Sequence, residues 1–199
     1  MRKDYIEYST DESNFYATRQ ALLADTRAPL AADPQDILMA AAQGQLPSDD
    51  AIDPLRPENV RYLIVHCTAT RCTADYRPED LIRDHEARGW SAVGYHFFIR
   101  KNGQIVQFRR TDEKGAHCRG RNAQSIGIAY EGGLDEDAEP ADTMTNLQID
   151  SMRVLIKALA RQFPNIVVRG HRDFNPAKAC PCFDAKQRFE KCTNEPLFK

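Results

Sequence analysis

One stretch near the C-terminal end, residues 167–185, restricts the possible folds of this chain more than any other. Within ten residues it holds an imidazole, an ammonium group and a thiol, from His171, Lys178 and Cys180, directly after a short apolar run. Imidazole nitrogen and thiolate sulfur are ligands that a zinc ion prefers. The spacing is not that of a zinc finger, in which paired ligands lie about two to four residues apart on both sides. A third ligand must therefore come from a distant part of the sequence.

His66 is the best candidate for the third ligand, because it ends another apolar run, residues 61–66. Two strands lying side by side in one sheet would bring it close to His171 and Cys180. Three protein ligands leave a fourth position open for water, which is the arrangement of a catalytic rather than a structural zinc. Cys182 offers the alternative, since a fourth protein ligand would close the site and make it structural.

The overall composition limits the class of protein. The formal net charge is −2, which argues against general nucleic-acid binding. No apolar run approaches the length of a membrane span, and the N-terminus lacks the apolar segment of a Sec signal. We therefore expect a protein that stays in the cytoplasm or leaves by a route without a cleaved signal. Three disulfides would be unusual in such a chain, so Cys67 and Cys118 are expected to be buried free thiols.

The charge distribution divides the chain near residue 59. Residues 1–59 carry a balance of −6, whereas residues 60–199 carry +4. Helix-compatible spacing at residues 13–25 and 35–43 is followed by a polar linker that contains several prolines. The extension either packs against the rest of the protein or covers its cleft as an arm. We expect a helical extension and linker over residues 1–59, a domain over 60–192 and a C-terminal tail over 193–199.

Apolar periodicity predicts alternating strands and helices after residue 60, and hence an α/β fold. Asn102-Gly103 is a hairpin signal, because these residues tolerate the positive φ angles of a tight turn, so at least one strand pair is antiparallel. Thr145 and Gln148 form the capping box of a long helix that ends at Pro164. The expected structure is a mixed central β-sheet flanked by helices, with strands at residues 62–67, 95–100, 105–108, 125–131 and 166–168 and helices at 79–88 and 146–163.

Three aromatic residues of the middle segment have predicted orientations. Strand alternation would place Tyr95 on the face of Phe97 and His96 on the opposite face, so that Tyr95 and His96 cannot both point into one cleft. His85 shares the apolar face of its helix and is expected to pack in the core. His96 is expected to be a hydrogen-bonded structural residue.

The sequence resembles the zinc-dependent N-acetylmuramoyl-L-alanine amidases of type 2 in four segments. This family includes phage lysozyme amidases and the animal peptidoglycan recognition proteins. Four blocks in the family's order are a far more specific signal than one short motif. They span about residues 60–190 and leave residues 1–59 uncovered. The segments are IVHCTAT (64–70), GYHFFIRKNG (94–103), GAHCRGRNAQSIGI (115–128) and GHRDFNPAKACPCFDA (170–185).

The resemblance implies a mixed sheet flanked by helices, with a metal at the floor of a groove. It also implies roles for particular residues, which are carried over only where this sequence matches the motifs. By motif position it assigns the Zn²⁺ ligands to His66, His171 and Cys180, the residues that assist catalysis to Tyr95 and Lys178, and the substrate groove to Thr68, His117 and Asn122.

The chain departs from the family pattern at two places. The segment between His171 and Lys178 is one residue longer than in the phage relatives, which can shift its loop. Some relatives carry a glutamate acting as base at the position of Ala129, and the phage-type branch lacks this acid as well. Glu131 lies on the same strand face as residue 129, so it either approaches the site or is solvated at the strand end.

The resemblance implies hydrolysis of the amide bond between the lactyl group of N-acetylmuramic acid and L-alanine of the peptidoglycan stem peptide. The expected partners are peptidoglycan or soluble muropeptides, and the protein is expected to be a monomer. Without a Sec signal it would act on the cell wall after release or through dedicated export. Two alternatives are a non-catalytic peptidoglycan-binding module and a regulatory role in binding another protein.

Overall fold

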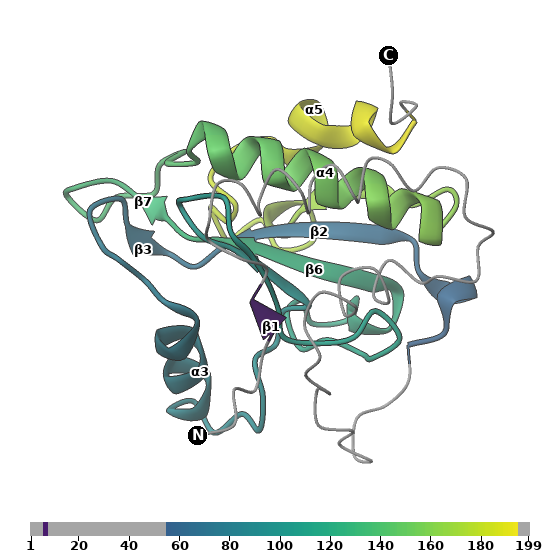
Figure 1. The fold of residues 1–199 in the computed structure, drawn as a ribbon, viewed down its shortest axis with the longest axis horizontal. Helices are drawn as coiled ribbons and strands as arrows, with labels where there is room; N and C mark the ends of the chain where they lie inside the picture. The colour runs from purple at the N-terminus through teal and green to yellow at the C-terminus, as the bar shows by residue number, and fades with distance from the viewer. Residues whose placement is uncertain (1–5, 8–54, 195–199) are drawn as a thin grey trace.

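A mixed β-sheet forms the centre of the computed structural model, which describes residues 6–7 and 55–194 (Figure 1). Within these residues the sheet has six strands, in the order β1 (Ile6–Glu7), β5 (Ile105–Gln107), β4 (Phe97–Ile99), β6 (Ser125–Tyr130), β2 (Tyr62–Cys67) and β8 (Val167–Gly170). β1 and β4 both run antiparallel to β5, whereas β4, β6, β2 and β8 run parallel to one another. A second, smaller sheet pairs β3 (Thr70–Arg71) with β7 (Gly133–Leu134).

Helices cover both faces of the main sheet (Figure 1). The helices α4 (Asn146–Gln162) and α5 (Ala185–Phe189) pack on one face, and α3 (Pro78–Glu86) packs on the other. This arrangement confirms the predicted α/β fold with a mixed central sheet flanked by helices. Short 3-10 helices are formed by Pro57–Asn59, Asn122–Gln124, His171–Asp173 and Glu190–Thr193.

The central strands are mostly apolar and buried along nearly their whole length, as expected where both faces of a sheet are covered. All six residues of β6 are buried, and so are the last five residues of β2. A larger core lies between the sheet and the helices α4 and α5. A smaller core on the α3 side contains Leu81, Val93, Phe98, Val106, Phe108 and Ala129.

The start and the buried face of α4 are those that its sequence predicts. Thr145 Oγ1 accepts a hydrogen bond from the backbone N–H of Gln148, and Gln148 Oε1 accepts one from the backbone N–H of Thr145. The predicted capping box is therefore confirmed. The predicted apolar stripe is buried in the larger core and consists of Met152, Leu155, Ile156, Leu159 and Phe163.

The predicted hairpin between β4 and β5 is confirmed, although its turn differs in detail. The backbone N–H of Arg100 donates to the carbonyl of Gln104 at 2.9 Å, so the loop contains three residues. Gly103 has a φ of 83°, whereas Asn102 is not among the described residues with positive φ. A single left-handed glycine thus suffices to reverse the chain here.

The strand β4 begins two residues later than predicted, at Phe97. The carbonyl of His96 accepts hydrogen bonds from the backbone N–H groups of both Phe108 and Arg109, at 2.9 and 3.4 Å, so two residues oppose one. This is the pattern of a β-bulge whose extra residue lies on the strand of Phe108 and Arg109, and the chain opposite it bends at His96, before β4 begins. As a result Tyr95 packs against the smaller core while Phe97 belongs to the larger one, and the prediction that they share a face is wrong.

The described fold begins before the predicted boundary at residue 60. Leu55 is 2% exposed and belongs to the larger core, and β1 falls within the predicted extension. The helices predicted at residues 13–25 and 35–43 lie outside the described residues. In the part of the chain that the structure describes, no helix combines the length and the apolar character needed to cross a membrane.

Replacement of Leu155 by alanine should lower the free energy of unfolding by about 2–5 kcal/mol, because it leaves a cavity in the larger core. Leu147 lies on the same helix but is 46% exposed. The matched control Leu147→Ala should therefore change the free energy of unfolding by less than about 0.5 kcal/mol. Urea unfolding followed by circular dichroism measures both values. Equal effects would contradict the buried face assigned to α4.

Candidate metal centre

The parallel pairing of β2 with β8 brings the three predicted ligands together. Val65 of β2 pairs with Gly170 at the end of β8, so the residues that follow them, His66 in β2 and His171 directly after β8, lie side by side. Cys180 returns to the same edge of the sheet through the loop that follows. The candidate ligand atoms of His66, His171 and Cys180 all lie within 4.8 Å of one another. We call these three residues the metal group.

The geometry of the metal group fits a zinc ion. His66 Nδ1 lies 3.8 Å from Cys180 Sγ, and the ring centroids of His66 and His171 are 4.7 Å apart. Around a tetrahedral zinc with typical bond lengths, a nitrogen and a sulfur ligand lie about 3.6 Å from each other. The backbone N–H of Cys67 donates to Cys180 Sγ at 3.3 Å, which holds this sulfur beside β2.

Burial keeps the two histidines of the metal group in the neutral form that a metal requires. His66 is 1% exposed, and burial, followed by the neighbouring His117 and His171, holds the pKa of its imidazole well below the usual range. The pKa of His171 is lowered by burial and then by the charge of Lys178. A neutral imidazole offers a lone pair to a metal without first losing a proton.

Cys182 lies outside the metal group although only one residue separates it from Cys180. Its thiol donates to the carbonyl of Gly133 at 3.1 Å and lies 3.9 Å from Cys67 Sγ. Burial and then Cys67 raise the pKa of Cys182 to about 12, so this side chain stays a protonated thiol. The geometry favours three ligands over a closed site with four. Cys67 and Cys118 are buried free thiols, as predicted.

The two residues expected to assist catalysis differ in their surroundings. The Tyr95 ring lies 5.1 Å from the His66 ring. Burial, followed by the thiols of Cys180 and Cys67, raises the pKa of the Tyr95 phenol, so its hydroxyl stays protonated. Lys178 is exposed, in a turn that begins at the carbonyl of residue 175, and its charge acts on His171.

Tyr95 and His96 both face the rings around the metal group, so their predicted placement on opposite faces is wrong. Tyr95 contacts His66, and the ring of His96 lies 5.7 Å from that of His117. The rings of His66 and His117 are in turn 5.0 Å apart. The physical reason is the bend at His96, which separates Tyr95 from the regular strand that begins at Phe97.

The three predicted groove residues form hydrogen bonds within the protein. His117 is 8% exposed, and its Nδ1 lies 3.0 Å from His66 Nε2. Asn122 Oδ1 accepts two backbone N–H groups, at 3.0 Å from His117 and 2.8 Å from the next residue. Thr68 Oγ1 accepts a backbone N–H at 3.0 Å. Their contact with a substrate stays a prediction, whereas the contact of His117 with His66 is a feature that sequence reasoning missed.

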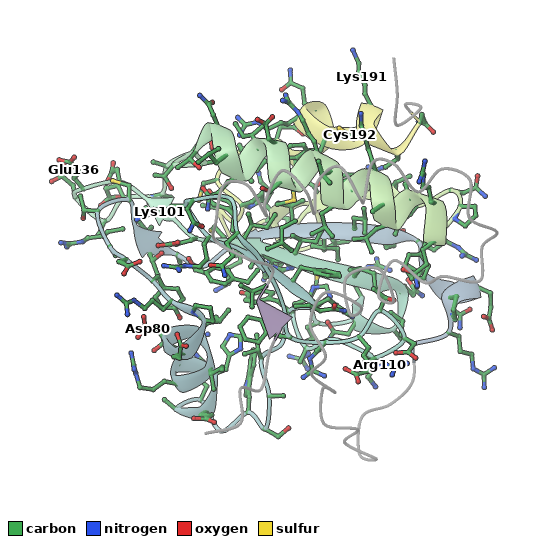
Figure 2. All side chains as sticks on the ribbon, viewed as in Figure 1. Asp80, Lys101, Arg110, Glu136, Lys191 and Cys192 are labelled. Atoms are coloured by element: carbon green, nitrogen blue, oxygen red, sulfur yellow. The ribbon has the colours of Figure 1, made fainter. Side chains whose placement is uncertain are left out.

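Glu131 stabilises the fold through hydrogen bonds and does not point at the metal group. It is 1% exposed, and its two oxygens accept hydrogen bonds from the backbone N–H groups of Tyr76 and Lys101, at 2.8 and 2.9 Å. The ammonium group of Lys101, which is labelled in Figure 2, adds an ion pair at 3.7 Å. The prediction of a solvated carboxylate is wrong. Because both oxygens accept hydrogen bonds from the backbone, Glu131 is not placed to act as the base. Ala129 pairs with His66 in the register of β6 and β2.

Two further buried histidines have the structural roles predicted for them. His85 Nδ1 accepts the backbone N–H of Gly94 at 3.1 Å, and His96 Nδ1 accepts that of Gly127 at 3.0 Å. A ring nitrogen that accepts a hydrogen bond carries no proton, so both rings are neutral in this fold. Burial lowers the pKa of each of these histidines to about 4.

The metal-free protein should lose stability as the pH falls from 6.5 to about 4, because in this range the unfolded chain binds protons at His85 and His96 that the folded chain does not. Stability therefore rises with pH, by at most about 1.4 kcal/mol per pH unit for each histidine. His85→Asn keeps an acceptor for Gly94 but does not titrate, so its slope should be smaller by one proton. Urea unfolding over a series of pH values measures both slopes, and equal slopes would contradict a neutral, buried His85.

Comparison with known proteins shows the family to which this chain belongs. A family model described as N-acetylmuramoyl-L-alanine amidase matches residues 56–183. The endolysin of Klebsiella phage KP32 is 38% identical over 129 residues, which cover 65% of this chain and 85% of that protein. A peptidoglycan-recognition protein of Drosophila melanogaster is 31% identical over 141 residues, covering 68% of this chain and 75% of that one. The solved structure of N-acetylmuramoyl-L-alanine amidase LysC from Clostridium intestinale URNW is similar with a TM-score of 0.58 at 29% identity, covering 75% of this chain and 93% of that chain. Since the matched residues include the whole metal group, the chain belongs to the N-acetylmuramoyl-L-alanine amidase family.

Proposed function

We propose that this chain is a zinc-dependent amidase that hydrolyses the bond between the lactyl group of N-acetylmuramic acid and L-alanine of the peptidoglycan stem peptide. The observation that carries the proposal is the metal group, which lies at the carboxyl edge of two parallel strands in a member of the amidase family. Two imidazoles and one thiolate suit zinc and leave a fourth position open, as hydrolysis requires.

The residues His66, His171 and Cys180 would hold the ion. When bound, zinc supplies a Lewis acid that activates water near neutral pH. The thiolate of Cys180 donates more negative charge than a third imidazole would and so weakens this acidity. Positive charge and hydrogen-bond donors from the rest of the site therefore gain importance in the transition state.

Tyr95 and Lys178 would supply these donors and charges. The protonated phenol of Tyr95 lies beside His66, where it can donate a hydrogen bond to the oxyanion or pass a proton to the leaving amine. Lys178 brings an ammonium group close enough to act on His171. Its charge would stabilise the oxyanion that forms as the amide carbonyl is attacked.

The substrate would be peptidoglycan or its soluble muropeptides, and the similarity to a peptidoglycan-recognition protein and to an amidase supports this class. Thr68 follows His66 by two residues and is half-buried, which supports the substrate contact expected of it. The protein would act as a monomer on the cell wall, after release from the cell or dedicated export.

A non-catalytic peptidoglycan-binding module is the second candidate. The similarity to a peptidoglycan-recognition protein is the observation that favours it. Such a module would use the same surface without hydrolysis. The complete metal group argues for the enzyme, because binding alone needs no metal with an open position.

Mass spectrometry of purified peptidoglycan incubated with the zinc-loaded protein separates the two candidates. The wild type should release stem peptides that begin with L-alanine, and Cys180→Ser should release none because it lacks the thiolate ligand. Cys182→Ser is the matched control and should release the same peptides, since its thiol lies outside the metal group. Intact wall that nevertheless retains the protein would support the binding module.

The role of the Tyr95 hydroxyl can be measured by Tyr95→Phe, which keeps the ring against His66. The kcat should fall about 10²–10³-fold with little change in KM, because a donor used in the transition state is lost. Steady-state kinetics with a soluble muropeptide gives both constants, and the zinc content of the variant checks that the metal group is intact. A decrease in kcat of less than about threefold would leave Tyr95 a packing role only.

A further inference from the structure

A buried histidine outside the metal group contacts one of its members. Nδ1 of His117 lies 3.0 Å from Nε2 of His66, and the two rings meet edge to face at 87°. This contact uses the nitrogen of His66 that does not face Cys180, since Cys180 Sγ lies 3.8 Å from His66 Nδ1. His66 is therefore contacted at both ring nitrogens, on one side by the metal group and on the other by His117.

Hydrogen bonds link Arg121, Ser125, His117 and His66 in a series. The donors and acceptors beyond His117 fix the position of each proton in this series. The carbonyl of Arg121 can only accept, so Ser125 Oγ donates its proton to it, at 2.8 Å. Ser125 Oγ then accepts from Nε2 of His117, at 3.4 Å, which is the longest contact of the series. With its proton on Nε2, His117 accepts at Nδ1, so His66 carries its own proton on Nε2. The lone pair of His66 Nδ1 is left on the side of Cys180.

Two glycines leave the space that the ring of His117 occupies. A Cβ on Gly127 would lie 2.5 Å from Cγ of His117, and a Cβ on Gly115 would lie 2.6 Å from its Cδ2. Gly127 is an interior residue of β6, where glycine otherwise weakens a strand. Asn122 Oδ1 holds the backbone N–H of His117 at 3.0 Å.

We propose that His117 is a positioning residue that sets the tautomer and the orientation of His66. The inference rests on the zinc-binding role proposed for His66, and it is separate from the groove contact predicted for His117. A ligating histidine whose second nitrogen is hydrogen-bonded presents the first nitrogen to the metal in a fixed direction. Without this acceptor, Nε2 of His66 would be buried without a partner, and both tautomers of the ring would become accessible.

Two substitutions that differ in the position of one acceptor test the proposal. In His117→Asn the amide oxygen takes the place of Nδ1 and accepts from His66, whereas in His117→Gln the amide extends toward the place of Nε2. The zinc dissociation constant of the full chain, measured by competition with a chelator at one neutral pH, should rise about 10–100-fold for His117→Gln and His117→Ala. For His117→Asn it should stay within about threefold of the wild type.

Two further measurements separate positioning from loss of structure. Long-range ¹H–¹⁵N NMR of the zinc-loaded wild type should show the proton of His66 on Nε2 and that of His117 also on Nε2. His85→Asn changes a buried histidine outside the series, so it should leave the zinc dissociation constant unchanged. Thermal unfolding of each metal-free variant shows whether it is folded.

The possible outcomes distinguish this inference from the proposed function. Equal zinc affinity of the wild type and His117→Ala would overturn the positioning role and leave the amidase intact. A folded His117→Asn that binds zinc as weakly as His117→Ala would also overturn it, because the acceptor would then be irrelevant. A wild type that binds zinc tightly but releases no stem peptides would refute the amidase alone, and a wild type that does not bind zinc would overturn both.

Discussion

The parallel hydrogen bonding of β2 with β8 is the constraint on which the rest of the site depends. It places His66 and His171 at one edge of the sheet, so their positions do not depend on the conformation of a long loop. Only Cys180 arrives on a loop, and that loop is anchored, since the backbone N–H of Arg172 donates to the carbonyl of Cys180 at 2.8 Å. Donors carried on packed strands keep their geometry better than donors on free loops. The metal group therefore shares the rigidity of the protein core.

The two faces of β6 serve different purposes. Ile126, Ile128 and Tyr130 belong to the larger apolar core, whereas the alternate residues Ser125, Gly127 and Ala129 are small. The small residues leave room for a layer of imidazole rings between the sheet and the α3 side of the molecule. Burial of these rings disfavours their charged form, which is the form that cannot bind a metal. β6 thus packs into the apolar core with one face and makes room for the imidazole rings with the other.

Features that depend on local sequence could be predicted, and those that depend on distant partners could not. Apolar runs indicate the strand that carries His66 and the strand that directly precedes His171, and the pair Thr145 and Gln148 marks the start of α4. The orientation of Tyr95 depends on a bend at His96, opposite a bulge in the neighbouring strand, and the partners of Glu131 come from segments far away in the sequence. Small residues at alternate positions of β6 signal that a bulky group occupies that face, but they do not tell which side chain it is.

The glycine in the middle of β6 has a consequence for attempts to improve the protein. A glycine in a central strand is an obvious target for stabilisation, since alanine or a β-branched residue restricts the unfolded chain and suits a strand better. At Gly127, however, any Cβ would lie 2.5 Å from the ring of His117, which would have to leave its place beside His66. Crowding a buried ring costs about 1–3 kcal/mol, more than the roughly 0.4–1 kcal/mol gained from a less flexible unfolded chain. The routine replacement of a strand glycine would therefore weaken the fold and disturb the metal group together.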